Sequence, residues 1–387
     1  MNIILDSNEQ TAIVFNLSDL QHYLERMTDK RSPQGKIYPL PLVLTYILLA
    51  KLAGCNTPNS IFSWVRKRQE PLLKLIDTHH NRVPCLNTYR TIMDCVIDAD
   101  ELADVLNQYL LAMYGGQQSV LICIDGKTMR GTIPKGTTSG MHMLAAYLPD
   151  EGIVLGQVEV ASKENEITAV HDLIDDLPLK GRVVCADAMQ TQRKLSVEVM
   201  AKGGDYLWFV KENQPTLLRD IEQFFKPPRY AKGWHIPKLP RTVAKQTCKG
   251  HGRLETRQLT VMEDSEAFLD WPGVRQVFKI ERDVIELNSG HTSSEVAYGL
   301  TSRHPETASA EQLLDWTRQY WGIENGLHYR RDVTLKEDST RMSLSKMPRV
   351  MATLNNFIVG LTQKLGYLNL AEARRVFDFS IATQIMA

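Results

Sequence analysis

Residues 121–132 read LICIDGKTMRGT, and this stretch decides the fold of the chain. Its short apolar run, rich in β-branched residues, predicts a buried strand that ends at Asp125. A second run of the same kind, residues 182–192 with the sequence RVVCADAMQTQ, ends at Asp187. Because the carboxyl ends of parallel strands meet at one edge of a sheet, we expect the two acids to be neighbours.

The elements around these two runs indicate an α/β fold. The predicted order is β-β-β-α-β-α-β, with strands at 119–124, 143–148, 153–160, 183–186 and 206–210 and helices at 165–177 and 191–202. Asn165 is expected to cap the first of these helices. A right-handed crossover would make the first and fourth strands neighbours.

The flanking regions predict further segments. Residues 1–112 are expected to form a helical N-terminal domain, because helical periodicity recurs at 18–27, 41–53, 59–68 and 98–114. Its basic run 66–68 beside Trp64 makes contact with DNA ends possible, and the alternative is a solvated helix end whose charge suits the helix dipole. Residues 113–225 are expected to begin the α/β core, 226–301 to form a β-rich insertion, and 302–387 to complete the core with helices at 309–329 and 347–365. The insertion is expected to contain strands at 243–249, 254–262, 274–282 and 295–301.

Global charge neither supports nor excludes a nucleic-acid partner. The 387 residues contain 45 Lys and Arg against 45 Asp and Glu. Residues 226–257 form one basic segment, in which Glu255 is the only acid and Tyr230 and Trp234 are interleaved. Its cations are Lys226, Arg229, Lys232, Lys238, Arg241, Lys245, Lys249, Arg253 and Arg257. Such a segment suits phosphate contact and stacking on bases, and its alternative is a solvated loop.

The cysteines and the N-terminus point to a cytoplasmic protein without a membrane span. The six cysteines show no metal-ligand spacing and are interpreted as reduced core residues. The N-terminus lacks the pattern of a signal peptide. The most apolar stretch, 40–54, is too short for a bilayer of about 30 Å.

A third acid lies far along the chain, in residues 320–338, YWGIENGLHYRRDVTLKED. Helical spacing aligns it on one stripe with five other residues, so that the stripe is Leu313, Thr317, Tyr320, Glu324, His328 and Arg331. The apolar residues around Glu324 predict an inward-facing carboxylate, whose burial a metal or an Arg would offset.

Each acid also has an ordinary structural explanation. Asp125 is a possible turn former, Asp187 a possible helix cap, and Glu324 a possible exposed helix acid. Their joint placement favours one site, because three carboxylates suit Mg²⁺ or Mn²⁺ and phosphodiester chemistry.

Six stretches in order resemble the insertion-sequence DDE transposases of the group that includes the H-repeat-associated proteins. They are IDGKTMRGT (124–132), KENEITAV (163–170), ADAMQTQ (186–192), DYLWFVKENQPTL (205–217), HGRLETR (251–257) and YWGIENGLHYRRDVTLKED (320–338). The resemblance extends from YPLPLVLTYILLAKLAGC (38–55) to near the C-terminus.

This resemblance implies an RNase H-like catalytic core, a mixed β-sheet flanked by helices, with Asp125, Asp187 and Glu324 as catalytic and metal-binding triad. It implies Mg²⁺ or Mn²⁺, two ions when DNA is bound, and a homodimer or larger assembly on DNA. The partners would be the terminal inverted repeats of the element and target DNA, in a bacterial cytoplasm and at the nucleoid. The wider signature Tyr-x2-Arg-x3-Glu-x6-Lys is altered here, because its other positions hold Thr317, Tyr320 and Arg331.

Polar residues near the three acids are candidates for contact with DNA. They are Lys127, Arg130, Lys211, Asn213, Gln214, Arg253, Arg257, His328 and Arg331. For residues 211–214 the alternative is a polar loop, and for 251–257 it is a ladder of ion pairs around Glu255. Asp332, Glu337 and Asp338 could help hold the metal site indirectly, but a solvated acidic face is the more common outcome and is the one expected here.

The sequence therefore predicts a metal-dependent transposase that cleaves DNA and joins strands at the ends of its element. Two alternatives stay open: an endonuclease of the same fold recruited by the host, and a catalytically silent DNA-binding remnant.

Overall fold

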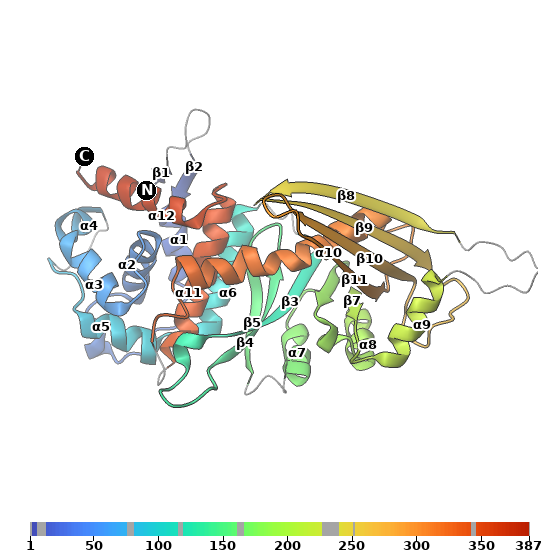
Figure 1. The fold of residues 1–387 in the computed structure, drawn as a ribbon. Helices are drawn as coiled ribbons and strands as arrows, with labels where there is room; N and C mark the ends of the chain where they lie inside the picture. The colour runs from blue at the N-terminus through green and yellow to red at the C-terminus, as the bar shows by residue number, and fades with distance from the viewer. Residues whose placement is uncertain are drawn as a thin grey trace, which may run out of the picture. The chain divides into compact units, whose positions relative to one another are not determined.

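A computed structural model describes residues 2–5, 13–75, 81–114, 119–160, 166–226, 240–250, 252–341 and 346–386 (Figure 1). The chain forms two compact units. Unit 1 comprises residues 1–118, 127–162 and 324–387, and unit 2 comprises 119–126 and 163–323.

Unit 1 is mainly helical. Its elements are β1 (Asn2–Leu5), β2 (Ile13–Asn16), α1 (Leu17–Leu24), α2 (Leu40–Leu52), α3 (Pro58–Lys67), α4 (Gln69–Leu75), α5 (Leu86–Thr91), α6 (Ala99–Met113), β4 (His142–Leu148), β5 (Ile153–Val160), α11 (Met347–Lys364) and α12 (Leu370–Met386). Strands β1 and β2 pair antiparallel, as do β4 and β5.

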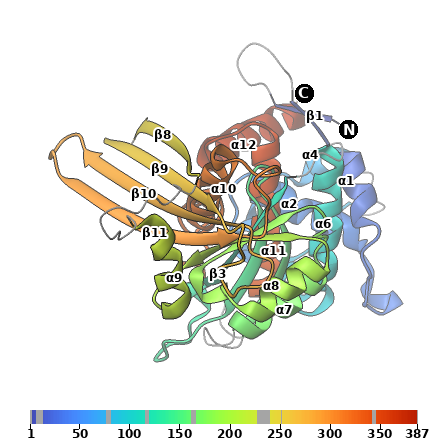
Figure 2. The ribbon, with the colours of Figure 1, turned by 90° about the vertical axis from the view of Figure 1, so that its right-hand side faces the viewer.

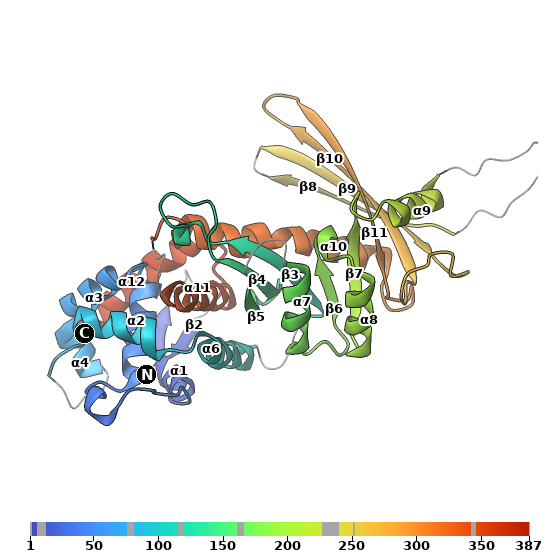
Figure 3. The same cartoon turned by 90° about the horizontal axis from the view of Figure 1, so that it is seen from below.

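Two helices carry much of the core of unit 1. Helix α2 is mostly apolar, and each of its residues except Pro41 is buried, including Thr45 and Lys51, as expected for a helix inside a core. Helix α11 contacts α6 and β5 (Figure 3). Its buried polar residues have partners: Gln157 donates to Thr353 at 2.8 Å and accepts from Asn356 at 3.0 Å. These bonds satisfy polar groups that would otherwise destabilise the core.

Unit 2 is built on a mixed sheet with the strand order β3-β6-β7-β11-β10-β9-β8. The strands are β3 (Leu121–Thr128, which enters unit 1 at Lys127), β6 (Val183–Ala186), β7 (Asp205–Val210), β8 (Thr242–Gly250), β9 (Arg253–Glu263), β10 (Gln276–Glu286) and β11 (Thr292–Thr301). β3, β6 and β7 run parallel, whereas β11 is antiparallel to β7. The long strands β8 to β11 form an antiparallel ribbon whose order ends at β8 (Figure 2).

Helices cover both faces of the central strands of unit 2. They are α7 (Glu166–Asp175), α8 (Arg193–Ala201), α9 (Pro215–Phe225) and α10 (Ala310–Ile323). Successive residues of β7 point to opposite faces: Trp208 donates to Ser196 of α8 at 2.9 Å, and Phe209 packs on Tyr320 of α10 with ring centroids 5.5 Å apart. Helix α10 therefore lies on the face that carries Phe209.

The predicted elements are largely confirmed, with two kinds of correction. The helix predicted for 309–329 is wrong beyond Ile323, because two π-helical turns follow it, η6 (Glu324–His328) and η7 (Arg330–Thr334). Strands β1 and β2 and helices α4, α5, α9 and α12 are additional elements. The proposed cap Asn165 lies outside the described residues.

Cysteine burial also differs from the prediction. All six cysteines are free, and Cys123 and Cys185 are buried as expected, but Cys85 and Cys95 are exposed. Among the described residues, no helix combines the length and the apolar character that a bilayer crossing requires.

Ser196→Ala should destabilise the protein by about 1–3 kcal/mol, because buried donors that lose their acceptor lose the stabilisation of the bond and stay desolvated. The hydroxyl of Ser196 accepts from the indole N–H groups of Trp208 and Trp271, at 2.9 and 3.2 Å. Urea unfolding followed by tryptophan fluorescence measures the change, with Ser289→Ala at an exposed position as control. Equal midpoints for the two variants would contradict the expectation.

Candidate active site

Asp125 and Asp187 occupy equivalent positions on adjacent parallel strands. The register of β3 and β6 pairs Cys123 with Cys185 and Ile124 with Ala186, so the next residues in order are the two acids. Asp187 keeps an extended backbone, with φ −62° and ψ 159°. Because adjacent strands lie about 4.8 Å apart, both carboxylates project from neighbouring positions on one sheet edge. The predicted pairing of these strands is confirmed.

The end of helix α10 lies beside the two acids. Burial raises the pKa of the Tyr320 phenol well above its ordinary value, and the negative charges of Asp125 and Asp187 raise it further. The register of β6 and β7 pairs Ala186 with Trp208, so that Phe209 is the next residue beside Asp187. Phe209 packs on both Tyr320 and Trp321. A neutral phenol therefore stands beside the acids, at the position where the wider DDE signature has an arginine.

The loop after β7 supports Asp187. Lys211 places its Nζ 3.5 Å from Asp187 Oδ1, with both side chains more than half exposed. Asn213 and Gln214 donate through their side-chain amides to the carbonyl groups of Ala188 and Thr191, at 2.8 and 3.0 Å. These two amides thus hold the loop that follows Asp187.

Asp187 also caps the short turn η5 (Ala188–Gln190), because its Oδ1 accepts from the Ala188 backbone N–H at 2.7 Å. Asp187 therefore acts as a cap, but of this short turn and not of the following helix, because α8 begins only at Arg193. The other oxygen is not used by this cap.

Glu324 is the residue that directly follows α10, and it opens the π-helical turn η6. Its neighbours Ile323 and Leu327 are buried, but Glu324 itself is exposed. The prediction that its side chain faces inward is wrong. A π-helical turn changes the angular spacing of side chains, and such turns are frequent at functional sites.

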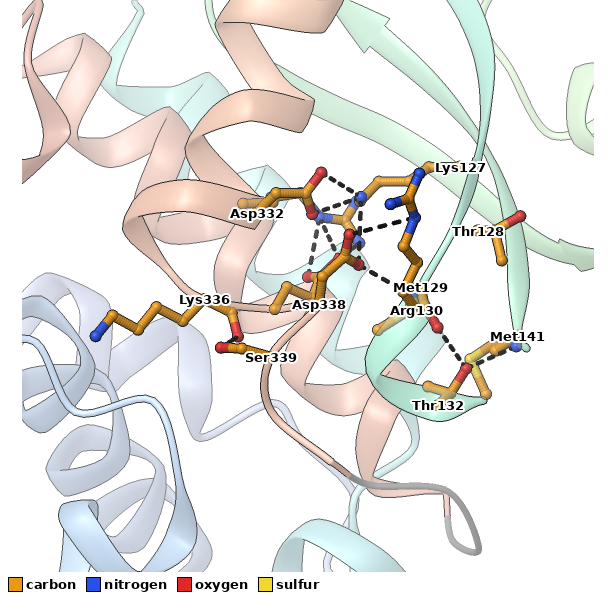
Figure 4. A network of polar contacts seen from close by, with 12 residues as sticks. Lys127, Thr128, Met129, Arg130, Thr132, Met141, Asp332, Lys336, Asp338 and Ser339 are labelled. Carbon is orange, nitrogen blue, oxygen red and sulfur yellow. Dashed lines mark hydrogen bonds and ion pairs between the residues drawn. The ribbon is translucent and has the colours of Figure 1, made fainter. Parts of the chain in front are cut away.

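A buried lysine follows Asp125 at two residues' distance (Figure 4). Lys127 is 9% exposed, and its Nζ lies 2.5 and 2.7 Å from the oxygens of Asp332 and 3.7 Å from Asp338. The backbone N–H of Arg130 donates to Asp338 at 2.9 Å. Within unit 1, these contacts of Lys127 and Arg130 with Asp332 and Asp338 join the segment after Asp125 to the segment after Glu324. The solvated face predicted for Asp332 and Asp338 is wrong.

Two further candidates are enclosed in unit 1. Arg331 is 1% exposed, and its guanidinium bonds to both oxygens of Glu337, with Nη2 to Oε1 at 2.7 Å. Asn355 donates to the same carboxylate at 2.8 Å. His328 is buried as well. Because Lys127, His328 and Arg331 are buried, the predicted contact of their side chains with DNA is not supported. Glu337 belongs to the core and not to an acidic face.

The insertion contains the predicted ladder of ion pairs. Glu255 lies 2.8 Å from Arg257 and also bonds to Arg282, which in turn lies 3.4 Å from Glu295. Arg253 is exposed. Much of the basic segment, from Arg229 to Lys238, and His251 lie outside the described residues.

The chemistry of the two strand-end acids fits a hard divalent cation, because carboxylate oxygens are the ligands that Mg²⁺ prefers. In the described part of the chain, no three His, Cys, Asp or Glu side chains are gathered closely enough to hold a metal ion. Asp125 and Asp187 lie in unit 2, and Glu324 is the first residue of a segment of unit 1.

Comparisons with known proteins agree along the chain. The family described as "Transposase DDE domain" matches residues 116–350, and "DDE_Tnp_1-associated" matches 21–110. "H repeat-associated putative transposase YhhI" of Escherichia coli K12 is 24% identical, over 89% of this chain and 90% of that protein. "Putative transposase YncI" of Escherichia coli O157:H7 is 28% identical, over 89% and 87%.

The solved structures that match include a piggyBac transposase synaptic complex with hairpin DNA. It is 10% identical, with a TM-score of 0.40, covering 95% of this chain and 78% of that chain.

Proposed function

Because the chain belongs to the family of insertion-sequence DDE transposases, we propose that it cleaves DNA at the ends of its element and joins the freed strands to target DNA. The family gives it an α/β, RNase H-like core, whose mixed sheet is that of unit 2. The observation that supports this proposal best is the pairing of Asp125 and Asp187 at one sheet edge, next to Tyr320.

The proposed triad consists of Asp125, Asp187 and Glu324. Tyr320 of α10 lies beside both aspartates, and Glu324 follows it by four residues in the sequence. These three carboxylates would hold Mg²⁺ or Mn²⁺, two ions with DNA bound. When bound, the ions neutralise charge on the attacking and leaving oxygens of the phosphodiester.

Other side chains have supporting roles in this proposal. Lys211 sits beside Asp187 and is exposed, so it can bind a DNA phosphate next to the reacting one. Asn213 and Gln214 position the Asp187 loop rather than the DNA. Arg130 and Arg253 are exposed cations that suit the DNA backbone. Bringing two element ends together would need at least two copies of the chain.

An assay with DNA of the element ends tests the proposal. Purified protein, Mg²⁺ and a duplex that carries the terminal inverted repeats with flanking DNA should yield 3′ hydroxyl ends and joined strands. EDTA should abolish both products. The products are separated on denaturing gels, and joining is scored with a supercoiled plasmid as target.

The outcomes of this assay distinguish a transposase from an endonuclease and from a silent DNA-binding remnant. Cleavage without any strand joining would support an endonuclease of the same fold. No cleavage, together with no Mn²⁺ binding by titration calorimetry in the presence of DNA, would support a silent DNA-binding remnant. Either result would refute the transposase proposal for this chain.

A further inference from the structure

A polar cleft of about 460 Å³ opens in unit 1 between the segments 130–137 and 338–341. The first segment follows β3, and the second follows the π-helical turn η7. Side chains of Arg130, Lys135, Thr137, Ser339 and Arg341 are among its lining. We call this the basic cleft.

Positive charge dominates the basic cleft. Arg130, Lys135 and Arg341 are all exposed, whereas Asp338 is the one carboxylate in the lining. Asp338 is already engaged: it accepts from the Arg130 backbone N–H at 2.9 Å and lies 3.7 Å from Lys127 Nζ. The guanidinium of Arg130 stays 4.0 Å from that carboxylate and is 79% exposed (Figure 4). The three side-chain cations are therefore available to an anion.

The two walls of the basic cleft are held together at Gly131. A Cβ on this residue would lie 2.4 Å from the carbonyl oxygen of Thr340 and 2.6 Å from that of Glu337. Only glycine allows so close an approach of two backbones. This contact fixes the backbones of the two segments that carry Arg130, Lys135 and Arg341, whose side chains line one cleft.

We propose that the basic cleft binds the sugar-phosphate backbone of DNA through Arg130, Lys135 and Arg341. Its volume falls in the range of small-molecule pockets, but such pockets are mostly apolar, and this lining is mostly charged and polar. Arginine and lysine are the residues that neutralise backbone phosphates, and such contacts position DNA without reading its sequence. The inference rests on the proposed function, because it takes DNA as the substrate.

Salt dependence of DNA binding tests the basic cleft directly. The probe is a fluorescent duplex of mixed sequence, and the full-length protein is titrated without divalent metal from about 50 to about 200 mM salt. Each of Arg130→Gln, Lys135→Gln and Arg341→Gln should lower the slope of log K against log salt by about 0.9, the value for one phosphate contact. The weakening should be the same on duplexes of different sequence.

Two matched controls are the exposed residues Lys180 and Arg375, changed to Gln. Their slopes should equal that of the unaltered protein, and thermal unfolding should show that all variants fold. Unchanged slopes for the three cleft variants would overturn the proposal, and so would equal losses in the controls, which would indicate a mere effect of net charge.

The salt titration and the cleavage assay test the basic cleft and the proposed function separately. Altered slopes with no strand cleavage would leave the basic cleft standing and refute the enzymatic activity. Cleavage and joining together with unaltered slopes would support the enzymatic activity and refute DNA binding by the basic cleft.

Discussion

Asp125→Asn, Asp187→Asn and Glu324→Gln should each lower DNA strand cleavage by about a thousandfold or more. Metal ions stabilise the charge of the transition state by several kcal/mol, and every 1.36 kcal/mol corresponds to about a tenfold change in rate. Losing one of the proposed carboxylate ligands forfeits much of that stabilisation. Single-turnover cleavage of end DNA measures the effect, and calorimetry with Mn²⁺ and DNA should show weakened binding in the same variants.

Matched carboxylates elsewhere give the control. Asp176 in unit 2 and Glu372 in unit 1 are exposed, and Asp176→Asn and Glu372→Gln should retain full cleavage. All five variants should unfold near the temperature of the unaltered protein. Asp187, Glu324 and the two control residues are exposed, and surface changes usually cost less than about 0.5 kcal/mol. Asp125 is half-buried, and Asn has nearly the same size and shape as the Asp that it replaces. Full activity in any one of the three acid variants would remove that residue from the triad.

Arg331→Met should destabilise the protein by about 3–5 kcal/mol, because it leaves the buried Glu337 carboxylate without its cation. Replacing both partners, as Arg331→Met with Glu337→Leu, should recover most of the loss, since an apolar pair of similar volume needs no desolvation of charge. Denaturant unfolding measures both changes. Arg375 is exposed, so Arg375→Met is the control and should change the stability little. An equally small loss of stability for Arg331→Met would contradict the role of Arg331 as the partner of Glu337.

The same pair predicts how stability depends on pH. Burial raises the pKa of Glu337, but the charge and hydrogen bonds of Arg331 and the bond from Asn355 lower it by more, so that it lies below its ordinary value. A depressed carboxyl pKa stabilises the fold above the unfolded value of about 4.3, and this contribution is lost as the pH falls through the folded value. Relative to the double variant, the unaltered protein should therefore lose stability below about pH 4.3.

The sequence predicted the strands and the pairing of Asp125 with Asp187, because both depend on local signals and on a general rule of connection. The apolar runs before the acids have strand character, and parallel neighbours place their carboxyl ends together. The ladder around Glu255 followed in the same way from strand alternation, as one of two stated alternatives.

The surroundings of Glu324 could not be predicted from the spacing of apolar residues. The α-helical stripe assumed about 3.6 residues per turn, but the backbone becomes π-helical at Glu324, and no residue type marks such a change. The exposure of Glu324 follows from this local geometry. The partners of Lys127 were missed for a different reason: Asp332 and Asp338 lie more than two hundred residues away, and only the tertiary fold reveals that contact.

The outer edge of β8 has a consequence for solubility. β8 ends the strand order of unit 2 and pairs with β9, so within the described residues its other edge has no partner strand. An open strand edge is a template for intermolecular sheets and aggregation. Lys245 and Lys249 are exposed on β8, and lysines on an edge strand oppose such association by charge repulsion and by the cost of desolvation. We therefore expect these two lysines to oppose self-association of the protein through the outer edge of β8 at high concentration.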